Sequence, residues 1–581
     1  MSKPKTAAPR LNTWQKYAIA DLHAISAENP DAIELLTAIP ALTDTHAYVK
    51  IRLPTKDLPA EPGGLRLRDH EEFIISIRQS VFAPPQADVE HPRFAGYPHV
   101  LQGHRLCVYL DPSREWDPLS GMRGFLERLW TWLSDAAAGR FNAATAMYHP
   151  VGGVLHLTPG TPAIVIREAV PGKPFQRAWL LPRTAHRLDM TFAAAPPAGL
   201  SMPVLTLTSD LPFGAGVTLA QLLEIIERPR NWGPPNHTGL GPAPARAVLT
   251  TLAFSASRNT SGSHQYFALA IPHPSGGPTH LLAGRLPIAA SDELRRLTRN
   301  HSHTIDLDCA EVGQDIPIEW CAVSDERPEV TTRRDDQRPV NAFQNKSVHI
   351  WGCGGLGSWI AEFVTRAGAA KVSLCDYANV TGGLLVRQDF VEADVGQSKA
   401  EALATRLRAI NDRVDVIVVP GVLPGNLAEV LASTDVIIDA TVSIAVGRAL
   451  AAASDKCPHA VLAQVATDTR TGTLGILSVS APSNTESPSV IDSRAGKTVL
   501  DDPALELYQP LWQEPLDGHE LTPTRGCSVP TFHGSAADLA AAAACLVNLL
   551  ALHLTAAASG THLIALPHAD GSGPYHHFIA A

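Results

Sequence analysis

A chain of 581 residues is too long for a single hydrophobic core, so the sequence predicts several domains. Hydrophobic residues make up 45% of the chain and charged residues 18%, which is typical of a soluble globular protein and excludes a largely disordered one. The formal net charge of −10 at pH 7 argues against a protein that holds nucleic acid on a basic face.

None of the eight cysteines forms a C-x-x-C pair with another. Zinc ribbons and disulfide scaffolds are therefore not expected, whereas a reducing cytoplasm with one or two reactive thiols is. The first residues lack the apolar run of a signal peptide. The one long apolar stretch, 536–558, carries Asp538, Asn548 and His553, so we expect a buried helix and no membrane span.

The first block, 1–150, opens and closes with apolar residues at helical spacing, the second time over 120–138. Strand-like runs lie between them, over 47–53, 73–77 and 105–110. A helix, a meander and a second helix predict an α+β domain.

The second block, 151–340, is rich in proline and glycine and has only short strand candidates, such as 163–166 and 204–208. It predicts a mostly β linking domain in which no motif carries recognisable chemistry. The charged, proline-containing stretch 325–344 is typical of a linker.

In the third block, 341–581, patterns typical of strands alternate with patterns typical of helices. Apolar runs over 347–351, 372–375, 414–419 and 436–438 predict strands, and 358–367 and 399–409 predict helices. This alternation predicts a Rossmann-like α/β domain with a mainly parallel sheet.

A Gly-rich turn follows the first of these strands, with the pattern G-x-G-x-x-G formed by Gly352, Gly354 and Gly357, and with Gly355 between them. Such glycines let the main chain approach a phosphate at a helix N-terminus. Asp376 ends the second strand, where a carboxylate can accept both ribose hydroxyls. On their own these features fit any nucleotide-binding Rossmann unit, and an oxidoreductase would be the default.

Cations further along the chain change that interpretation. Arg387 and Gln388 follow Asp376 by eleven residues, and Lys399 opens the next predicted helix. An arginine and a lysine so placed can face the outer phosphates of ATP, where charge builds up as pyrophosphate leaves. A dehydrogenase has no need of them.

Taken in order, the Gly-rich turn, the acidic ribose ligand, Arg-Gln and G-x-x-K resemble the ThiF/MoeB and ubiquitin-activating adenylyltransferase family over 345–480. The resemblance implies that the nucleotide is ATP with Mg²⁺ and that the adenylation domains form a homodimer. The sequence departs from the family at Ala378, where a second Asp is usual, and at Leu384, where an Asn is usual. Asp439 is the candidate for magnesium binding or positioning, in D-A-T-V where the family favours D-x-T-D.

Cys527 follows Arg525, after a polar stretch that predicts a mobile loop over about 482–527. A neighbouring arginine favours a reactive thiolate, although a small residue in a turn would look the same. The resemblance implies a nucleophile, because ubiquitin-activating enzymes carry their acceptor cysteine in a mobile segment late in this domain. Cys353, inside the Gly-rich turn, is predicted to be a packing residue.

A second motif set lies in the first block. Tyr97-Pro98-His99, then Cys107, then Trp116-Asp117-Pro118 resemble the ubiquitin-conjugating fold, whose pattern is H-P-N, Gly-x-Ile-Cys and Trp-x-Pro. The resemblance implies that Cys107 carries a thioester, that His99 stands where an Asn supports the oxyanion, and that Asp117 can orient an attacking lysine. From local sequence alone, Cys107 fits a buried strand cysteine and Asp117 a turn residue.

The two motif sets describe consecutive chemistry. A protein C-terminus attacks ATP to give an acyl-adenylate, Cys527 captures it as a thioester, and Cys107 receives it for conjugation to a target protein. Such a fusion resembles those of CBASS-type and related ubiquitination-like antiphage operons in bacteria, which implies that the activated partner is a cGAS-like nucleotidyltransferase or a ubiquitin-like protein. The alternatives are a sulfur-carrier protein adenylyltransferase and a non-catalytic nucleotide-binding scaffold.

Overall fold

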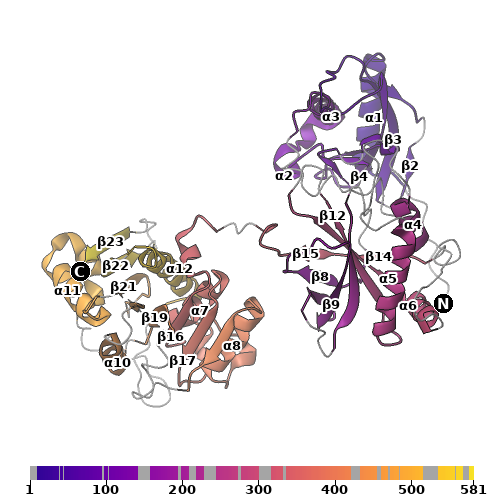
Figure 1. Cartoon of the computed structure of the whole chain (residues 1–581). Coiled ribbons are helices and arrows are strands. Elements are labelled where there is room, and N and C mark those ends of the chain that lie inside the picture. Colours follow the sequence, from indigo (N-terminus) through magenta and orange to yellow (C-terminus); the bar gives the residue numbers. More distant parts are fainter. Residues whose placement is uncertain are drawn as a thin grey trace, which may run out of the picture. The chain divides into compact units, whose positions relative to one another are not determined.

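The computed structural model describes residues 10–37, 40–43, 45–94, 97–101, 104–141, 158–193, 198–208, 217–227, 244–272, 277–299, 316–331, 335–420, 432–441, 443–454, 459–468, 471–482, 484–513, 534–556, 558–566 and 575–581. The chain divides into two compact units, Met1–Thr332 and Arg333–Ala581 (Figure 1). The first unit holds two sheets and the second holds one.

The first sheet is antiparallel, in the order β1-β3-β4-β5-β7-β6, with β2 beside β3. Its strands are β1 (Glu34–Leu35), β2 (Ala41–Leu42), β3 (His46–Pro54), β4 (His70–Arg78), β5 (Gln86–Asp88), β6 (Val100–Leu101) and β7 (Arg105–Leu106). The helical elements around it are α1 (Thr13–Glu28), η1 (Pro92–Phe94), α2 (Pro112–Glu115), η2 (Pro118–Ser120) and α3 (Gly121–Ala137).

One face of this sheet is apolar and packs against α1 and α3. Burial alternates strictly along β3, so every second side chain enters the core. Asn12 caps α1 by accepting a hydrogen bond from the Gln15 N–H at 2.8 Å, and the Gln15 amide donates to the Ile77 carbonyl of β4 at 3.0 Å. The expected α+β domain with helices at both ends is confirmed, although the strand expected over 105–110 ends at Leu106.

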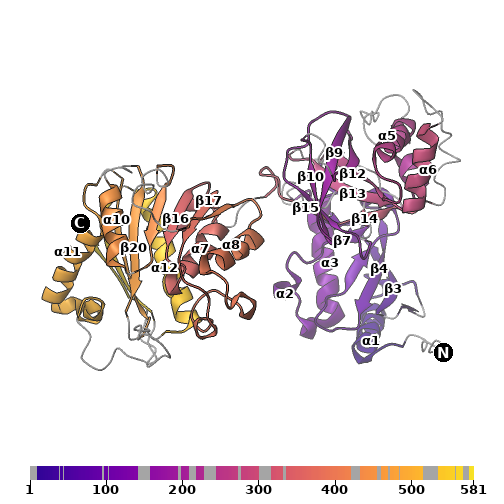
Figure 2. The ribbon, with the colours of Figure 1, turned by 90° about the horizontal axis from the view of Figure 1, so that it is seen from below.

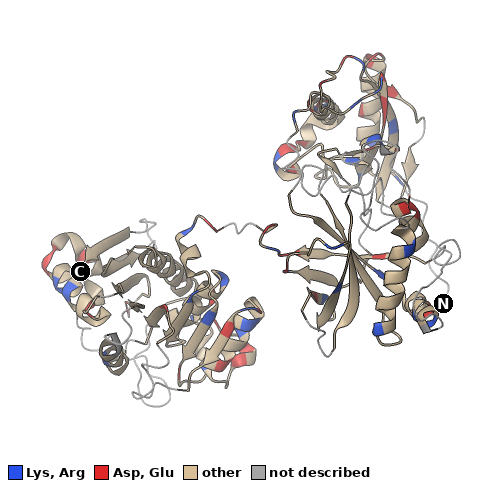
Figure 3. Ribbon diagram, viewed as in Figure 1, with Lys and Arg blue, Asp and Glu red and all other residues tan. Residues whose placement is uncertain are grey.

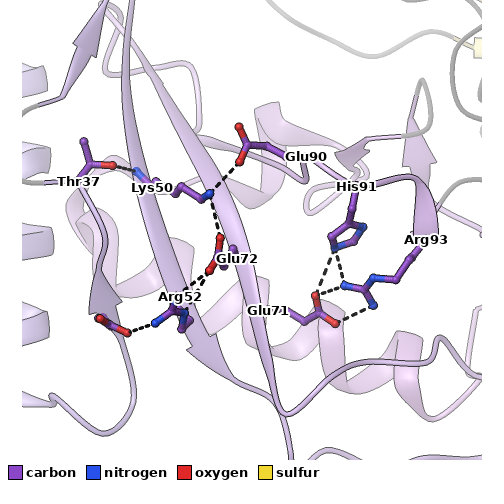
Figure 4. A network of polar contacts seen from close by, with 9 residues as sticks. Thr37, Lys50, Arg52, Glu71, Glu72, Glu90, His91 and Arg93 are labelled. Atoms are coloured by element: carbon purple, nitrogen blue, oxygen red, sulfur yellow. Dashed lines mark hydrogen bonds and ion pairs between the residues drawn. The ribbon is translucent and has the colours of Figure 1, made fainter.

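The other face of β3 and β4 carries charges, which Figure 4 shows in detail. Lys50 and Arg52 pair with Glu72 across the strands at 2.9 and 2.8 Å, in partly exposed positions. The neighbouring Glu71 is only 1% exposed and accepts hydrogen bonds from Arg93 and His91. Burial alone would raise its pKa, but these bonds and the Arg68 N–H lower the pKa of Glu71 to about 2.

The central sheet is mixed, in the order β14-β13-β12-β11-β9-β10-β8-β15. Its strands are β8 (Ala163–Ile166), β9 (Phe175–Thr184), β10 (Arg187–Thr191), β11 (Leu200–Thr206), β12 (Gln265–Ile271), β13 (His280–Leu286), β14 (Glu319–Cys321) and β15 (Val323–Asp325). Its helices are α4 (Leu219–Glu227), α5 (Pro244–Arg258) and α6 (Ile288–Arg299).

A single segment joins the two edges of this sheet. Its first half, β14, pairs with β13, and its second half, β15, pairs with β8 at the opposite edge. The sheet therefore curls around an apolar interior that includes Leu180, Val204 and Ala268, while α4, α5 and α6 share a second core with its outer face. The predicted β content of 151–340 is confirmed in the sheet, but the three helices were not expected.

The second unit contains the predicted Rossmann-like sheet, in the order β18-β17-β16-β19-β20-β21-β22-β23. Its strands are β16 (Ser347–Trp351), β17 (Lys371–Cys375), β18 (Asp415–Val418), β19 (Val436–Asp439), β20 (Val461–Thr467), β21 (Leu474–Ser480), β22 (Gly560–Ala565) and β23 (Tyr575–Ala580). Its α-helices are α7 (Gly355–Arg366), α8 (Lys399–Ile410), α10 (Ile444–Ser454), α11 (Pro488–Asp501) and α12 (Ala536–His553).

The first five strands of that order are parallel, and β21 to β23 extend the sheet antiparallel. Helices α7, α8 and α12 share one core with one face of the sheet, while α10 and α11 pack on the other face (Figure 2). Among the described helices, only α12 is long and apolar enough to cross a membrane. Its Leu539, Leu546 and Leu550 are buried in the core, as expected from the sequence.

The prediction of a mobile loop over about 482–527 is wrong in part. Residues 488–501 form α11, and Pro503–Leu511 form a 3₁₀ helix. Pro488 stands in the first turn, and Ile491, Ala495 and Val499 recur every fourth residue on a buried face, which stabilises a helix in spite of the polar composition.

Replacing Glu71 by Gln removes a buried charge and leaves Arg93 unpaired, so we expect a loss of about 3 kcal/mol of unfolding free energy at pH 7. The control is Glu72→Gln next to it, where a partly exposed ion pair predicts less than about 1 kcal/mol. Because the pKa of Glu71 is lowered, the difference from wild type should shrink as the pH falls from about 4.5 towards about 2. Denaturant unfolding measures both, and equal losses for the two variants would contradict the assignment.

Candidate active site

The carboxyl ends of three neighbouring parallel strands bring the predicted nucleotide-binding residues together. Trp351 at the end of β16 is in register with Cys375 of β17 on one side and with Asp439 of β19 on the other. The Gly-rich turn, Asp376 and Asp439 therefore meet at one edge of the sheet, where open α/β sheets bind ligands.

The Gly-rich turn needs its glycines for close main-chain packing. Gly352 has φ +87°, and a Cβ atom on it would lie 2.9 Å from the Ala440 carbonyl oxygen. A Cβ atom on Gly357 would lie 1.7 Å from the Gly352 carbonyl oxygen. The turn leads directly into α7, whose N-terminal amides face the carboxyl edge of the sheet.

The Asp376 carboxylate holds this turn in place. Its Oδ2 accepts the Cys353 N–H and its Oδ1 accepts the Ala378 N–H, both at 2.8 Å. Each oxygen retains a second lone pair for a further donor. Asp376 is half-buried, so a ribose could reach it from the solvent side.

Cys353 is fully buried, and burial followed by the charge of Asp376 raises the pKa of its thiol well above the ordinary value. The expectation of a packing residue rather than a nucleophile agrees with this position. The Lys399 charge partly offsets this rise in the pKa of Cys353. Lys399 is 9% exposed, and its main-chain N–H donates to the Ala378 carbonyl at 3.0 Å.

Arg387 and Gln388 lie beside the start of α7. The Trp359 indole N–H donates to the Arg387 carbonyl at 3.3 Å, and the Gln388 amide nitrogen lies 4.0 Å from where a Cβ atom on Gly354 would be. Gln388 is buried, and its Oε1 has no hydrogen-bond partner in the described part of the chain. A buried polar atom without a partner is uncommon and fits a site that a ligand completes.

Asp439 is 1% exposed at the end of β19. Its Oδ1 accepts the Thr441 N–H at 2.9 Å and the Thr441 hydroxyl at 2.6 Å, whereas its buried Oδ2 has no partner among the described residues. Burial raises the pKa of this carboxyl in spite of the two bonds. A buried carboxylate oxygen with a free lone pair is the donor that Mg²⁺ prefers, so Asp439 fits the metal expected with ATP.

A buried ion cluster supports the Arg387–Gln388 segment from behind. It was not predicted from the sequence. Arg406 of α8 contacts both Glu362 of α7 and Asp389, each at 2.8 Å. The Asp389 N–H also donates to the Ser358 hydroxyl at 3.1 Å. Its acidic members stand at unrelated positions in the chain, so no motif signalled the cluster.

One proton is shared within this cluster. Burial and then the hydrogen bond with Glu362 raise the pKa of Asp389 to about 7. Burial would also raise that of Glu362, but hydrogen bonds from Asp389, Arg366 and Arg406 lower the pKa of Glu362 to about 2. As the pH falls below about 7, this coupled pair therefore takes up its first proton mainly on Asp389.

Cys107 lies just after β7 and is half-buried. Its thiol donates to the Tyr109 carbonyl at 3.4 Å, and burial followed by the charge of Glu115 raises its pKa. The Trp116 indole N–H donates to the Val81 carbonyl at 2.9 Å and fixes the segment that follows the cysteine.

His99 contacts this cysteine through the main chain, because its carbonyl accepts the Cys107 N–H at 2.9 Å. His99 has φ +62°, which few non-glycine residues adopt, and its ring packs edge-on to Phe141 at 4.9 Å. Asp117 is exposed and caps η2, with Oδ1 accepting the Leu119 N–H at 2.9 Å. Cys527 lies outside the described residues.

Three family models match successive parts of the chain. The prokaryotic E2 family A model matches residues 19–153, the Cap2 central linker domain model matches 193–326, and the ThiF family model matches 332–559. The chain is therefore a fusion of an E2-like, that is ubiquitin-conjugating-like, domain with a ThiF domain. A match to the Cap2 central linker domain lies between the two, and this order agrees with the fusion that the sequence resembles.

Curated relatives match shorter parts of the chain. The chain is 34% identical over 117 residues to tRNA threonylcarbamoyladenosine dehydratase of Escherichia coli K12, covering 20% of this chain and 44% of that protein. It is 33% identical over 107 residues to molybdopterin-synthase adenylyltransferase of the same organism (18% and 43%) and 32% identical over 125 residues to ubiquitin-like modifier-activating enzyme 5 of Drosophila virilis (22% and 30%). The chain thus spans less than half the length of these relatives.

Solved structures that resemble the chain include PaaA, with 15% identity and a TM-score of 0.31 over 42% of this chain and 67% of that one. E. coli MccB with ATP has 16% identity and a TM-score of 0.30 over 42% and 66%. Both are too distant to inform the chemistry.

Gly357→Ala should prevent the turn from forming, because its Cβ atom would lie 1.7 Å from a carbonyl oxygen. We expect at least a ten-fold loss of ATP affinity in equilibrium titration. Gly383→Ala is the matched control, since a Cβ atom there meets nothing within 4 Å, and it should bind within two-fold of wild type. Equal affinity of the two variants would contradict the role of the turn.

The shared proton of the ion cluster predicts a pH effect on stability. Between pH 5 and 7 the folded protein retains a proton on Asp389 that the unfolded chain has released, so this group destabilises the fold as the pH rises. Asp389→Asn removes that dependence, and its unfolding free energy should gain about 2 kcal/mol relative to wild type from pH 5 to pH 7. Parallel stability curves of the two proteins, from denaturant unfolding, would show that Asp389 stays ionised.

Proposed function

We propose that this chain activates the C-terminus of a protein with ATP and transfers it as a thioester to a target. The observation that carries the proposal is the assembly of Gly352, Asp376, Gln388, Lys399 and Asp439 around one Gly-rich turn, with buried acceptor atoms left unpaired there. The E2-like domain on the same chain supports the later steps.

In this proposal the turn of Gly352, Gly354, Gly355 and Gly357 holds the phosphates, and Asp376 accepts the ribose hydroxyls. Gln388 completes the pocket beside Gly354. Its buried Oε1 accepts a hydrogen bond from the nucleotide, because no donor of the described residues reaches this atom.

The first reaction is adenylation. A carboxylate oxygen of the partner attacks the α-phosphorus of ATP, the bond to the bridging oxygen breaks, and pyrophosphate leaves with the electron pair. Arg387 and Lys399 stabilise the charge that develops on the outer phosphates. Asp439 holds Mg²⁺, which supplies further charge neutralisation when bound.

The second and third reactions are thiol exchanges. The Cys527 sulfur attacks the acyl carbon and releases AMP, and the Cys107 sulfur then displaces that of Cys527. The Cys107 thiol gives up its proton in the exchange, and its raised pKa means that a base must take that proton. An amine of the target finally attacks the Cys107 thioester, with His99 and Asp117 as the candidates to support the oxyanion and orient the amine.

The partner is a ubiquitin-like protein or a cGAS-like nucleotidyltransferase, and the setting is a cytoplasmic antiphage system in which the chain acts as a homodimer. The Cap2 central linker and the E2-like domain support this choice over a sulfur-carrier adenylyltransferase, because that activity has no use for a conjugating cysteine.

The relay is tested by mixing the protein with ATP, Mg²⁺ and proteins encoded beside its gene, followed by intact mass measurement and non-reducing gels. We expect a reducible adduct that is lost in Cys527→Ala and that accumulates on Cys527 in Cys107→Ala. Cys545→Ala is the matched control, because that half-buried cysteine lies within α12 and should leave the adduct unchanged.

An adduct that survives Cys527→Ala would contradict the proposed order. A protein thiocarboxylate product would favour the sulfur-carrier alternative, and ATP binding without pyrophosphate release would favour the non-catalytic scaffold.

Lys399→Ala should lower ATP–pyrophosphate exchange by about 100-fold, the usual effect of removing one group that stabilises a transition-state charge. Lys346→Ala is the control, since Lys346 is half-exposed and pairs with Asp435 at 3.5 Å before β16 begins. Equal exchange rates in the two variants would exclude Lys399 from the reaction.

A further inference from the structure

The central sheet has a cavity of about 210 Å³ between β9, β11 and α5. Its lining includes Arg177 and Arg258, the hydroxyl residues Ser201 and Ser255, and the aromatic residues Phe175 and Phe254. The cavity belongs to the domain in which the sequence shows no chemistry, and none of its lining residues takes part in the proposed transfer.

The two arginines bring like charges to the same space. Arg258 is the last residue of α5, and its Nη1 donates to the Phe254 carbonyl at 2.8 Å, which fixes the guanidinium against the cavity wall. Burial and then the positive charge of Arg177 lower the pKa of Arg258. Neither arginine has an acidic partner in the described part of the chain, and α5 itself carries no acidic residue (Figure 3).

Other arginines of this sheet are neutralised, which makes this pair an exception. Arg183 and Arg187 both contact Asp189, at 2.9 and 2.7 Å. Arg285 contacts Glu319 at 2.5 Å. Two unpaired guanidiniums at one cavity repel each other, and an anion placed between them would remove that repulsion.

The floor of the cavity is rigid and polar. The Ser255 hydroxyl donates to the Ser201 carbonyl at 2.9 Å and lies 3.0 Å from the Ser201 hydroxyl. Asn259 accepts the Ser201 N–H at 2.6 Å and donates to Gln265 at 3.0 Å, and all four side chains are buried. Such a network holds the hydroxyls in place before any ligand arrives.

We propose that this cavity is a binding site for an oxyanion, a carboxylate or phosphate, carried on a small apolar group. Arg177 and Arg258 bind the anion, and Phe175 and Phe254 contact the apolar part. The cavity, of about 210 Å³, has room for a small group such as a phenyl ring that carries the anion. The anion is either a free small molecule or an acidic side chain of a bound protein.

The test is isothermal titration of the full-length protein at low ionic strength with phenyl phosphate, benzoate and a capped peptide that carries one glutamate between two phenylalanines. We expect saturable binding of at least one probe, weakened at least ten-fold by Arg177→Gln and by Arg258→Gln. Tighter binding of the peptide than of the free anions points to a protein segment, and the reverse points to a small molecule.

Arg183→Gln is the matched control, because it removes the same charge from the same strand at a residue already paired with Asp189. It should bind the probe as wild type does. If one of the two arginine variants lowers the melting temperature, the other decides, since both side chains are exposed. No saturable binding of any probe, or equal weakening by Arg183→Gln, overturns the proposal. The titration needs neither Cys107 nor ATP turnover, so its result is independent of the transfer reaction.

Discussion

The two hydrogen bonds of the Asp376 carboxylate are the constraint on which the candidate nucleotide site depends. One fixes the Gly-rich turn at Cys353, and the other fixes the segment that leads through Ala378 to Lys399. Parallel strands place these parts at the same edge, and this carboxylate links the turn to the segment beyond β17. Two of the three loops at this edge are thereby held to each other.

The buried polar groups on the two sides of the Arg387–Gln388 segment differ in whether they have a partner. Behind it, Asp389 is fully engaged with Glu362 and Arg406, so the segment has a fixed base. In front of it, Gln388 and Asp439 keep buried oxygen atoms unpaired. Leaving such atoms unpaired costs about 1–3 kcal/mol each, a cost that a bound ligand removes. The unpaired oxygen atoms of Gln388 and Asp439 thus support the proposal that a ligand binds on this side of the segment.

The sequence predicted the second unit well because its parallel strands are buried on both faces and read as continuous apolar runs, so β16, β17 and α8 appear near their predicted bounds. The glycines of the turn could be singled out from sequence because close main-chain approach tolerates few other residues, and Asp376 because it directly follows an apolar strand. Helices α4, α5, α6 and α11 were missed, since helices that lie among proline-rich and polar segments give weak periodicity. Asp389 and Arg406 were missed because their role exists only once α7 and α8 pack.

The segment from β14 to β15 has a consequence for biosynthesis. Because it pairs with β13 at one edge and with β8 at the other, the central sheet stays open along two edges until its last residues have been made. The ribosome therefore has to deliver Asp325 before the central sheet can close, while the preceding E2-like sheet, complete at Leu106, can form earlier. A nascent chain stopped before that point would expose two unpaired strands, so translation itself sets the order in which this protein becomes resistant to proteolysis.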